Sequence, residues 1–185
     1  MSMTLSGGTV LLDARQLLER VALGPGMQVA DLGCGATGHY IIPAARIVGA
    51  SGMAYAVDIQ KSALAGTAGR AKLAGVSNIT YLWSDIERVG ATSIPPASLD
   101  CAMLLNTLYL TTHPDRAIAE AARLTKPNGI VVIVEWKPDA TAVGPAVHRR
   151  LTTDRIRVAA QSAQLVEESM FTAGAYHDGF LFRKG

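Results

Sequence analysis

Apolar and polar residues follow one another along this chain in two periods, which predict alternating strands and helices. Short runs of mostly apolar residues predict strands at 28–32, 53–58, 78–83, 99–105, 130–136, 165–172 and 178–183. Apolar residues spaced three and four apart predict helices at 11–23, 39–48, 61–73, 113–124 and 153–163. Because strands and helices alternate over most of the chain, the pattern predicts an α/β fold with a wound sheet.

Size and composition place this pattern in one packed domain. The 185 residues are enough for a single α/β domain, so we expect one domain over residues 1–185. The chain is 49% hydrophobic and 17% charged, which is typical of a globule and not of a disordered segment. It has no long apolar run and no basic-then-apolar start, so we expect a cytoplasmic protein without a membrane span.

The stretch 28–39 is the most informative part of the sequence. A buried strand ends in a turn with Gly33, Gly35 and Gly38, and a helical run follows. A strand, a glycine turn and a helix start together form a notch of nucleotide size. Asp31 stands two residues before the first glycine, where its carboxylate would repel a phosphate. A carboxylate at this point therefore argues against a pyrophosphate in the notch.

Two further acids repeat the position of Asp31 at strand ends. Asp58 closes the second predicted strand, 27 residues after Asp31, and Asp85 follows the third strand after another 27 residues. This spacing suits one strand-helix-strand unit for each step. The two oxygens of the Asp58 carboxylate match the vicinal hydroxyls of a ribose, so we expect Asp58 to bind a ribose.

Taken in order, these motifs resemble those of class I S-adenosylmethionine-dependent methyltransferases. The matching features are Asp31-x-Gly33-x-Gly35, Asp58, Asp85, Leu99-Asp100 and Leu124-Thr-Lys-Pro-Asn-Gly129, within residues 11–183. The resemblance is greatest to the ubiquinone/menaquinone-biosynthesis group. It implies a Rossmann-like sheet of seven strands, mostly parallel with the last strand antiparallel, and helices on both faces. It also implies S-adenosyl-L-methionine as the cofactor and a methyl-transferring enzyme.

The resemblance assigns the cofactor site to residues on three strand ends and the loop after the fourth. The implied cofactor-binding residues are Asp31, Gly33, Cys34, Gly35, Gly38, Asp58, Ile59, Asp85, Ile86 and Asn106. Asp85 is expected to accept from the adenine amino group, between Ile59 and Ile86. Ordinary core packing explains both isoleucines equally well.

The catalytic side of the site is less defined by the sequence. Tyr109 and His113 are the candidate catalytic residues, with His39 and Glu135 as further titratable groups near the ligand edge. Methyl transfer is a single displacement on an activated carbon, so a base is optional. A histidine often stands in relatives where this chain has Tyr109, and a surface role at a helix start also explains His113.

Aromatic residues suggest the acceptor. Trp136, Tyr40 and Tyr109 predict a small or flat hydrophobic acceptor. Its pocket is expected to come from the N-terminal segment, the loop after the fourth strand and residues 137–150, with a second subunit of a homodimer as a further source. Cys34 and Cys101 lack the spacing of metal ligands, so no metal site is predicted.

Two other functions remain open on the residues alone. The pattern Gly33-x-Gly35-x-x-Gly38, with Asp58 20 residues beyond, also fits an NAD(P)-dependent Rossmann oxidoreductase. The basic cluster at 148–157, made of His148, Arg149, Arg150, Arg155 and Arg157, would suit an RNA-modifying or RNA-binding module. A net charge of only +2 argues against a nucleic-acid partner. A solvated helix face explains the same cluster.

Overall fold

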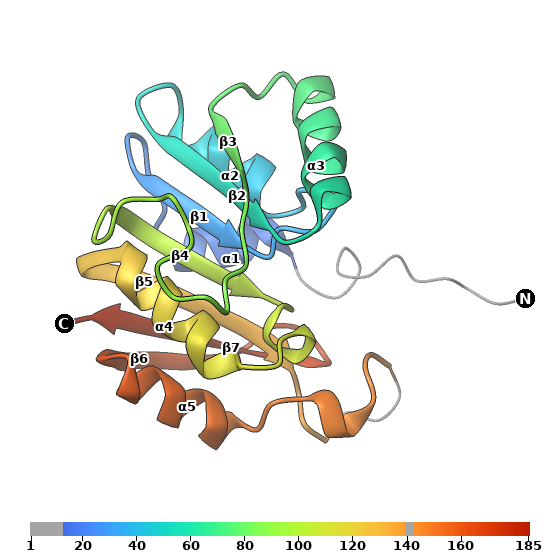
Figure 1. The fold of residues 1–185 in the computed structure, drawn as a ribbon, viewed down its shortest axis with the longest axis vertical. Coiled ribbons are helices and arrows are strands. Elements are labelled where there is room, and N and C mark those ends of the chain that lie inside the picture. The colour runs from blue at the N-terminus through green and yellow to red at the C-terminus, as the bar shows by residue number, and fades with distance from the viewer. Residues whose placement is uncertain (1–12, 140–142) are drawn as a thin grey trace, which may run out of the picture.

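Seven strands form one sheet in a computed structural model that describes residues 13–139 and 143–185 (Figure 1). The strand order is β3-β2-β1-β4-β5-β7-β6. The bounds are β1 Gln28–Leu32, β2 Met53–Asp58, β3 Ile79–Trp83, β4 Leu99–Leu105, β5 Thr125–Trp136, β6 Leu165–Thr172 and β7 His177–Lys184. The pairs among β1 to β5 are parallel, and β7 is antiparallel to both β5 and β6. This confirms the predicted seven-stranded sheet with its last strand reversed.

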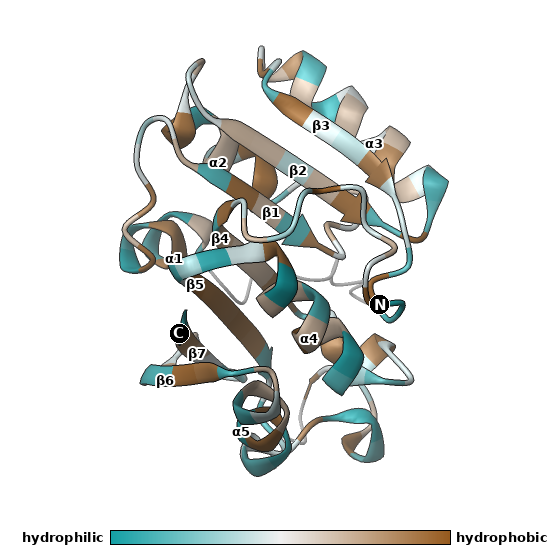
Figure 2. Cartoon of the chain, turned by 60° about the vertical axis from the view of Figure 1, so that its left-hand side comes forward, coloured by the Kyte–Doolittle hydropathy of each residue, from teal (hydrophilic) through white to brown (hydrophobic). Residues whose placement is uncertain are grey.

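Helices cover both faces of the sheet, as predicted. They are α1 Ala14–Arg20, α2 Ile41–Val48, α3 Lys61–Leu73, α4 Pro114–Leu124 and α5 Thr153–Ser162, with short 3-10 helices η1 Leu108–Leu110 and η2 Val147–Arg149. Helices α1, α2 and α3 pack on one face, and α4 and α5 on the other, in front of the sheet in Figure 1. The central strands are mostly hydrophobic (Figure 2), as expected for strands buried on both faces.

The order of the strands determines where a ligand can bind. The chain moves outward from β1 through β2 to β3, then returns so that β4 pairs with the other side of β1. Ligands of open α/β sheets bind beyond the carboxyl ends of the strands at such a reversal. Here Asp31, Asp58 and Leu105 lie at or near those carboxyl ends.

Three predicted elements differ from the structure by two residues or more at a boundary. The first helix covers Ala14–Arg20 and not 11–23, because Asp13 caps its start and Ala22 adopts a left-handed φ of 50° beyond its end. Residues 11 and 12 lie outside the described part of the chain. The second helix begins at Ile41, two residues later than predicted.

The fifth strand begins at Thr125 and not at residue 130. Thr125 already pairs with Leu99, and the ladder resumes with Cys101 opposite Ile130. The four residues 126–129 therefore form a bulge within β5, where Asn128 has a φ of 63°. Asparagine tolerates this conformation, as expected for the turn.

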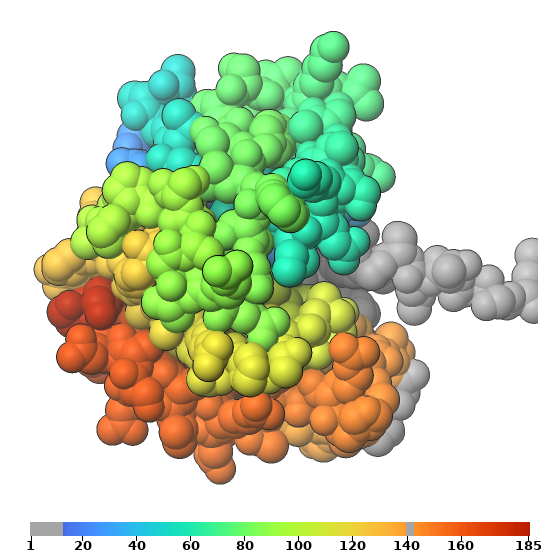
Figure 3. All heavy atoms as spheres, in the orientation of Figure 1, coloured from blue at the N-terminus to red at the C-terminus, as the bar shows by residue number. Residues whose placement is uncertain are grey.

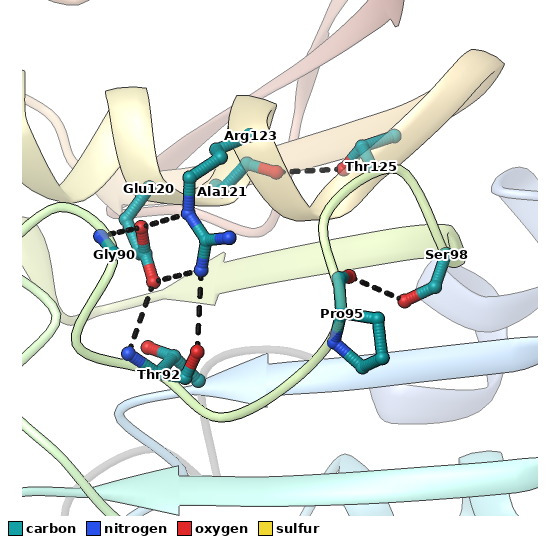
Figure 4. Close-up of polar contacts among 8 residues, drawn as sticks. All are labelled: Gly90, Thr92, Pro95, Ser98, Glu120, Ala121, Arg123 and Thr125. Atoms are coloured by element: carbon teal, nitrogen blue, oxygen red, sulfur yellow. Dashed lines mark hydrogen bonds and ion pairs between the residues drawn. The ribbon is translucent and has the colours of Figure 1, made fainter.

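The long connection between β3 and β4 is fixed to α4 by one buried carboxylate (Figure 4). The Glu120 side chain is fully buried and accepts hydrogen bonds from the backbone N–H groups of Gly90 (2.8 Å) and Thr92 (3.3 Å). Arg123 pairs with the same carboxylate at 2.7 Å and donates to the Thr92 carbonyl. These contacts hold the segment that carries Asp85.

No helix within residues 13–139 and 143–185 is both long and apolar enough to cross a membrane.

Candidate active site

A cavity of about 690 Å³ opens at the carboxyl ends of β1 to β4. Of the predicted site residues, those that line it are Asp31, Gly33, Cys34, Gly35, Asp58, Ile59, Asp85, Ile86, Asn106 and Tyr109. Gly38 and His113 are not among the lining residues. The structure thus brings ten of the twelve predicted site residues together around one space.

The glycine turn after β1 leaves the backbone accessible to a ligand. Gly33 has a φ of 93°, and a Cβ there would lie 2.4 Å from Cγ2 of Thr107, so no larger residue fits between the two loops. Gly35 has a φ of 63°, and a Cβ there would meet no atom within 4 Å. The Thr67 hydroxyl of α3 donates to the Gly35 carbonyl at 2.8 Å and helps fix the turn.

Asp58 joins the turn to the second strand. Its Oδ2 accepts from the Gly35 N–H at 3.0 Å, and its Oδ1 accepts from the Gln60 N–H at 2.8 Å. A carboxylate oxygen has two acceptor positions, so each oxygen retains capacity for a further donor. Asp58 is therefore placed to fix the turn and to accept hydrogen bonds from a ligand in the cavity.

Asp31 and Asn106 leave buried acceptors at the base of the cavity. Asp31 is 1% exposed, and its Oδ2 finds no hydrogen-bond partner among the described residues. Asn106 adopts a φ of 53°, and its Oδ1 likewise has no partner there. Burial, with a smaller contribution from Asp58, raises the pKa of Asp31 to about 7. Buried acceptors without donors favour a ligand with cationic or N–H groups.

The adenine end predicted from the resemblance lies after β3. The Asp85 Oδ1 accepts from the Glu87 N–H at 2.9 Å, which orients the carboxylate in its turn. Ile86 is 8% exposed and packs in the core, whereas Ile59 is 59% exposed. Core packing therefore accounts for Ile86 but not for Ile59, which is free to contact a ligand.

Glu135 holds the loop after β4 and does not line the cavity. It is 2% exposed, and its Oε1 accepts from the N–H groups of Thr107 (2.9 Å) and Leu108 (2.6 Å). Burial raises the pKa of Glu135 to about 7. Glu135 thus positions η1 and Tyr109, and it does not reach the cavity as a base.

The two candidate catalytic residues are placed differently. Tyr109 lines the cavity, and burial and the Glu135 carboxylate raise the pKa of its hydroxyl. His113 is exposed, precedes α4, and donates its backbone N–H to Oε2 of Glu87 at 2.6 Å. The geometry agrees with the helix-start interpretation of His113.

Cys34 lines the cavity, but its thiol is not activated. Burial raises the pKa of its thiol well above the ordinary value, and Asp31 and Asp58 act in the same direction. The thiol is therefore protonated near neutral pH and unsuited to nucleophilic attack.

Several lining residues were not predicted as site residues. They include Thr107 and Thr111 after β4, Gln60 after β2 and Glu87 after β3. Each follows a predicted strand end within a few residues, and this position was the only signal in the sequence. The predicted pocket aromatics Tyr40, Tyr109 and Trp136 all line the cavity.

The sequence also matches a known family model and several curated relatives. The family model described as a methyltransferase domain matches residues 23–173. The ubiquinone/menaquinone biosynthesis C-methyltransferase UbiE of Pseudomonas paraeruginosa is 33% identical over 146 residues, covering 77% of this chain. UbiE of Ralstonia nicotianae is 35% identical over 140 residues, covering 72% of it. In both cases the match covers 55% of the relative, so the chain spans about half the length of these curated relatives.

Solved structures share the fold. A methyltransferase from Aquifex aeolicus, described as dependent on S-adenosylmethionine, superposes with a TM-score of 0.85 at 23% identity, covering 95% of this chain and 91% of its own. The [4+2]-cyclase SpnF superposes with a TM-score of 0.77 at 17% identity, covering 92% and 79%. Since a cyclase shares this architecture, the fold alone does not specify the reaction.

Proposed function

The chain belongs to the class I S-adenosylmethionine-dependent methyltransferases, and from this membership we propose that it transfers a methyl group to a small-molecule acceptor. One observation supports the proposal most directly. Acids from three successive strand ends, Asp31, Asp58 and Asp85, line a single cavity of about 690 Å³. These acids suit a nucleoside that bears an ammonium and a sulfonium, and they would repel a pyrophosphate.

The lining residues have the donor and acceptor chemistry that S-adenosylmethionine requires. The buried acceptor of Asp31 would receive its amino group, and the open backbone at Gly35 would approach the nucleoside. Asp58 would accept from the ribose hydroxyls and Asp85 from the adenine amino group, with Ile59 against the ring. The cofactor supplies a methyl group already activated by a sulfonium, so the protein has to align the acceptor and exclude water.

The acceptor is proposed to bind between the cofactor and the aromatic side chains of the cavity. Tyr109 and Trp136 line that part of the cavity together with Asn106, whose backbone is held by Val134. Since Glu135 positions the loop from Thr107 to Leu108, it would control the approach of the acceptor without touching it. Tyr109, whose raised pKa keeps its hydroxyl protonated, is the candidate to orient the acceptor by a hydrogen bond.

Calorimetry tests the cofactor, and methyl transfer tests the reaction. S-adenosylmethionine and S-adenosylhomocysteine are expected to bind with micromolar affinity, on the order of −8 kcal/mol. Tritiated methyl groups should then pass to a component of a fractionated cell extract or to a panel of quinols and phenols. Transfer to none of these would contradict the small-molecule acceptor, and absence of binding would contradict the whole proposal.

The two alternative functions receive no support from the comparisons. A nicotinamide dinucleotide should not bind the cavity, which a parallel titration measures. RNA retention with a steep salt dependence would support an RNA-modifying role instead. The expectations of a cytoplasmic location and of a homodimer stay predictions, and light scattering of the purified protein tests the second.

A further inference from the structure

The basic cluster at 148–157 divides into three parts in the structure. Arg150 is buried and donates to the carbonyls of Lys137 (2.9 Å), Val143 (2.8 Å) and Pro145 (3.0 Å). It thus joins residues 137, 143 and 145 to the end of η2.

Arg157 is also engaged, on the far side of α5. It makes two hydrogen bonds to the Glu167 carboxylate, at 2.7 and 3.0 Å. A bidentate pair of this kind satisfies the guanidinium and leaves little capacity for a ligand.

The remaining three residues of the cluster line a second pocket. His148, Arg149 and Arg155 are exposed and surround a space of about 210 Å³ with Tyr109 and Thr111. None of the described residues that line this pocket is acidic. Within the described part of the chain, no ion pair engages Arg149 or Arg155. An uncompensated pair of guanidinium groups in a concave surface favours an anion.

The second pocket adjoins the active-site cavity. Residues 109–111 line both spaces, so the two spaces meet at the turn around η1. On the molecular surface, the yellow-green residues after β4 lie against the orange residues that precede α5 (Figure 3). Arg149 also lowers the pKa of the Tyr109 hydroxyl, against the larger effect of burial, so its charge acts on a side chain that lines both pockets.

We propose that the methyl acceptor carries an anionic group, a carboxylate or a phosphate monoester, which Arg149 and Arg155 bind while the methylated end lies in the cavity beside Tyr109. This inference rests on the proposed function and adds the chemical class of the acceptor. Guanidinium groups recognise both anions through paired N–H donors, so the shared feature is a planar or tetrahedral oxyanion. A neutral acceptor would leave this pair of charges without a role in recognition.

Binding of small anions to the whole chain tests the inference. Benzoate, phenyl phosphate, inorganic phosphate and neutral benzyl alcohol are each titrated into ¹⁵N-labelled protein saturated with S-adenosylhomocysteine. We expect benzoate or phenyl phosphate to shift the amide signals of residues 109–112 and 148–151, and benzyl alcohol to shift neither. Tighter binding of benzoate identifies the anionic group as a carboxylate, and tighter binding of phenyl phosphate identifies it as a phosphate.

Two double variants with equal loss of charge provide the comparison. Arg149→Ala/Arg155→Ala should weaken binding of the preferred anion at least tenfold. Arg70→Ala/Lys72→Ala, on the exposed side of α3, should leave it unchanged. All of these side chains are exposed, so folding is preserved.

Three results would overturn the inference: equal binding to both double variants, no binding of either aromatic anion, or inorganic phosphate binding as tightly as phenyl phosphate. The last would indicate a site for free anions. S-adenosylhomocysteine should bind the Arg149→Ala/Arg155→Ala variant with unchanged affinity. If S-adenosylhomocysteine binds the unmodified protein but the aromatic anions do not, only the inference fails. If S-adenosylhomocysteine binds neither the unmodified protein nor the variants, the proposed function fails.

Discussion

Asp31 couples the charge of the cavity to pH. In the folded protein the pKa of its buried carboxyl is raised to about 7, first by burial and then by Asp58. The ammonium group of the ligand, placed at Asp31 by the proposal, favours the ionised carboxylate, so ligand binding lowers this pKa and releases a proton. The affinity for S-adenosylhomocysteine should therefore rise with pH up to about 7 and then level off, by at most about tenfold for each pH unit.

Calorimetry at pH 5.5, 6.25 and 7.0 measures this dependence. Asp31→Asn should bind more weakly at pH 7.0 and show a flat profile, whereas Asp115→Asn, on the exposed first turn of α4, should retain the slope. Equal affinities of the unmodified protein at all three pH values would contradict the assignment of Asp31.

Asp58 supports both the glycine turn and the proposed ribose contact. Asp58→Ala removes the acceptor for the Gly35 and Gln60 N–H groups as well as for a ligand. The loss of charged hydrogen bonds should weaken S-adenosylhomocysteine binding by about 1.5–3 kcal/mol, roughly ten- to a hundred-fold. Isothermal titration measures it, with circular dichroism to confirm that the variant is folded. An unchanged affinity would exclude Asp58 as the ribose ligand.

Single residues also show what a sequence can and cannot reveal about this site. Asp31 and Asp58 were predictable because a parallel strand fixes where its last residues lie. The approach of Gly33 to Thr107 was not, since it joins residues 74 positions apart through the packing of two loops. No local pattern records such a distance.

At the scale of elements, the strands were predicted well because most are buried on both faces and read as apolar runs. The predicted start of the fifth strand at residue 130 was wrong, because Thr125 joins the sheet only through its pairing with Leu99. Helix η1 was not predicted either, since the Glu135 carboxylate from a distant strand holds its first N–H groups. Tertiary contacts decide both cases, and the local sequence does not contain them.

The connection between β3 and β4 should depend on Glu120. Glu120→Ala leaves the Gly90 and Thr92 N–H groups without an acceptor and Arg123 without its partner. Breaking a buried ion pair in this way should lower the free energy of unfolding by about 3 kcal/mol.

Urea unfolding measures the loss as a lower midpoint at constant slope. Glu19→Ala, which breaks the exposed Arg15–Glu19 pair, is the matched control and should leave the midpoint unchanged. Equal midpoints for the two variants would show that Glu120 does not anchor the connection.

At the scale of the whole molecule, the sheet and its loops assemble one cavity from segments far apart in the chain. Residues after β1, β2, β3 and β4 all contribute to the lining, and α3 supports the glycine turn. In the basic cluster at 148–157, folding instead separates residues that are neighbours in sequence. Arg150 is buried and binds backbone carbonyls, Arg157 pairs with Glu167, and the other three residues line an open pocket. The sequence therefore identified most of the predicted residues that line the cavity but did not assign the basic residues.

Because the cavity is shared among so many elements, a ligand that fills it should stabilise the whole fold. A ligand that binds only the folded state, present at 100 times its Kd, adds about 2.7 kcal/mol to the free energy of unfolding. For a domain of this size the melting temperature should rise by roughly 5–10 °C with S-adenosylhomocysteine. A nicotinamide dinucleotide at the same concentration should cause no shift.

Differential scanning calorimetry measures both ligands, and the Asp58→Ala variant adds an internal comparison. Its shift at a fixed concentration of S-adenosylhomocysteine should be smaller, because the stabilisation depends on the logarithm of the ratio of concentration to Kd. A rise with the dinucleotide and none with S-adenosylhomocysteine would mean that the strand-end acids accommodate phosphates after all. The charge argument for the cofactor would then be wrong for the molecule as a whole.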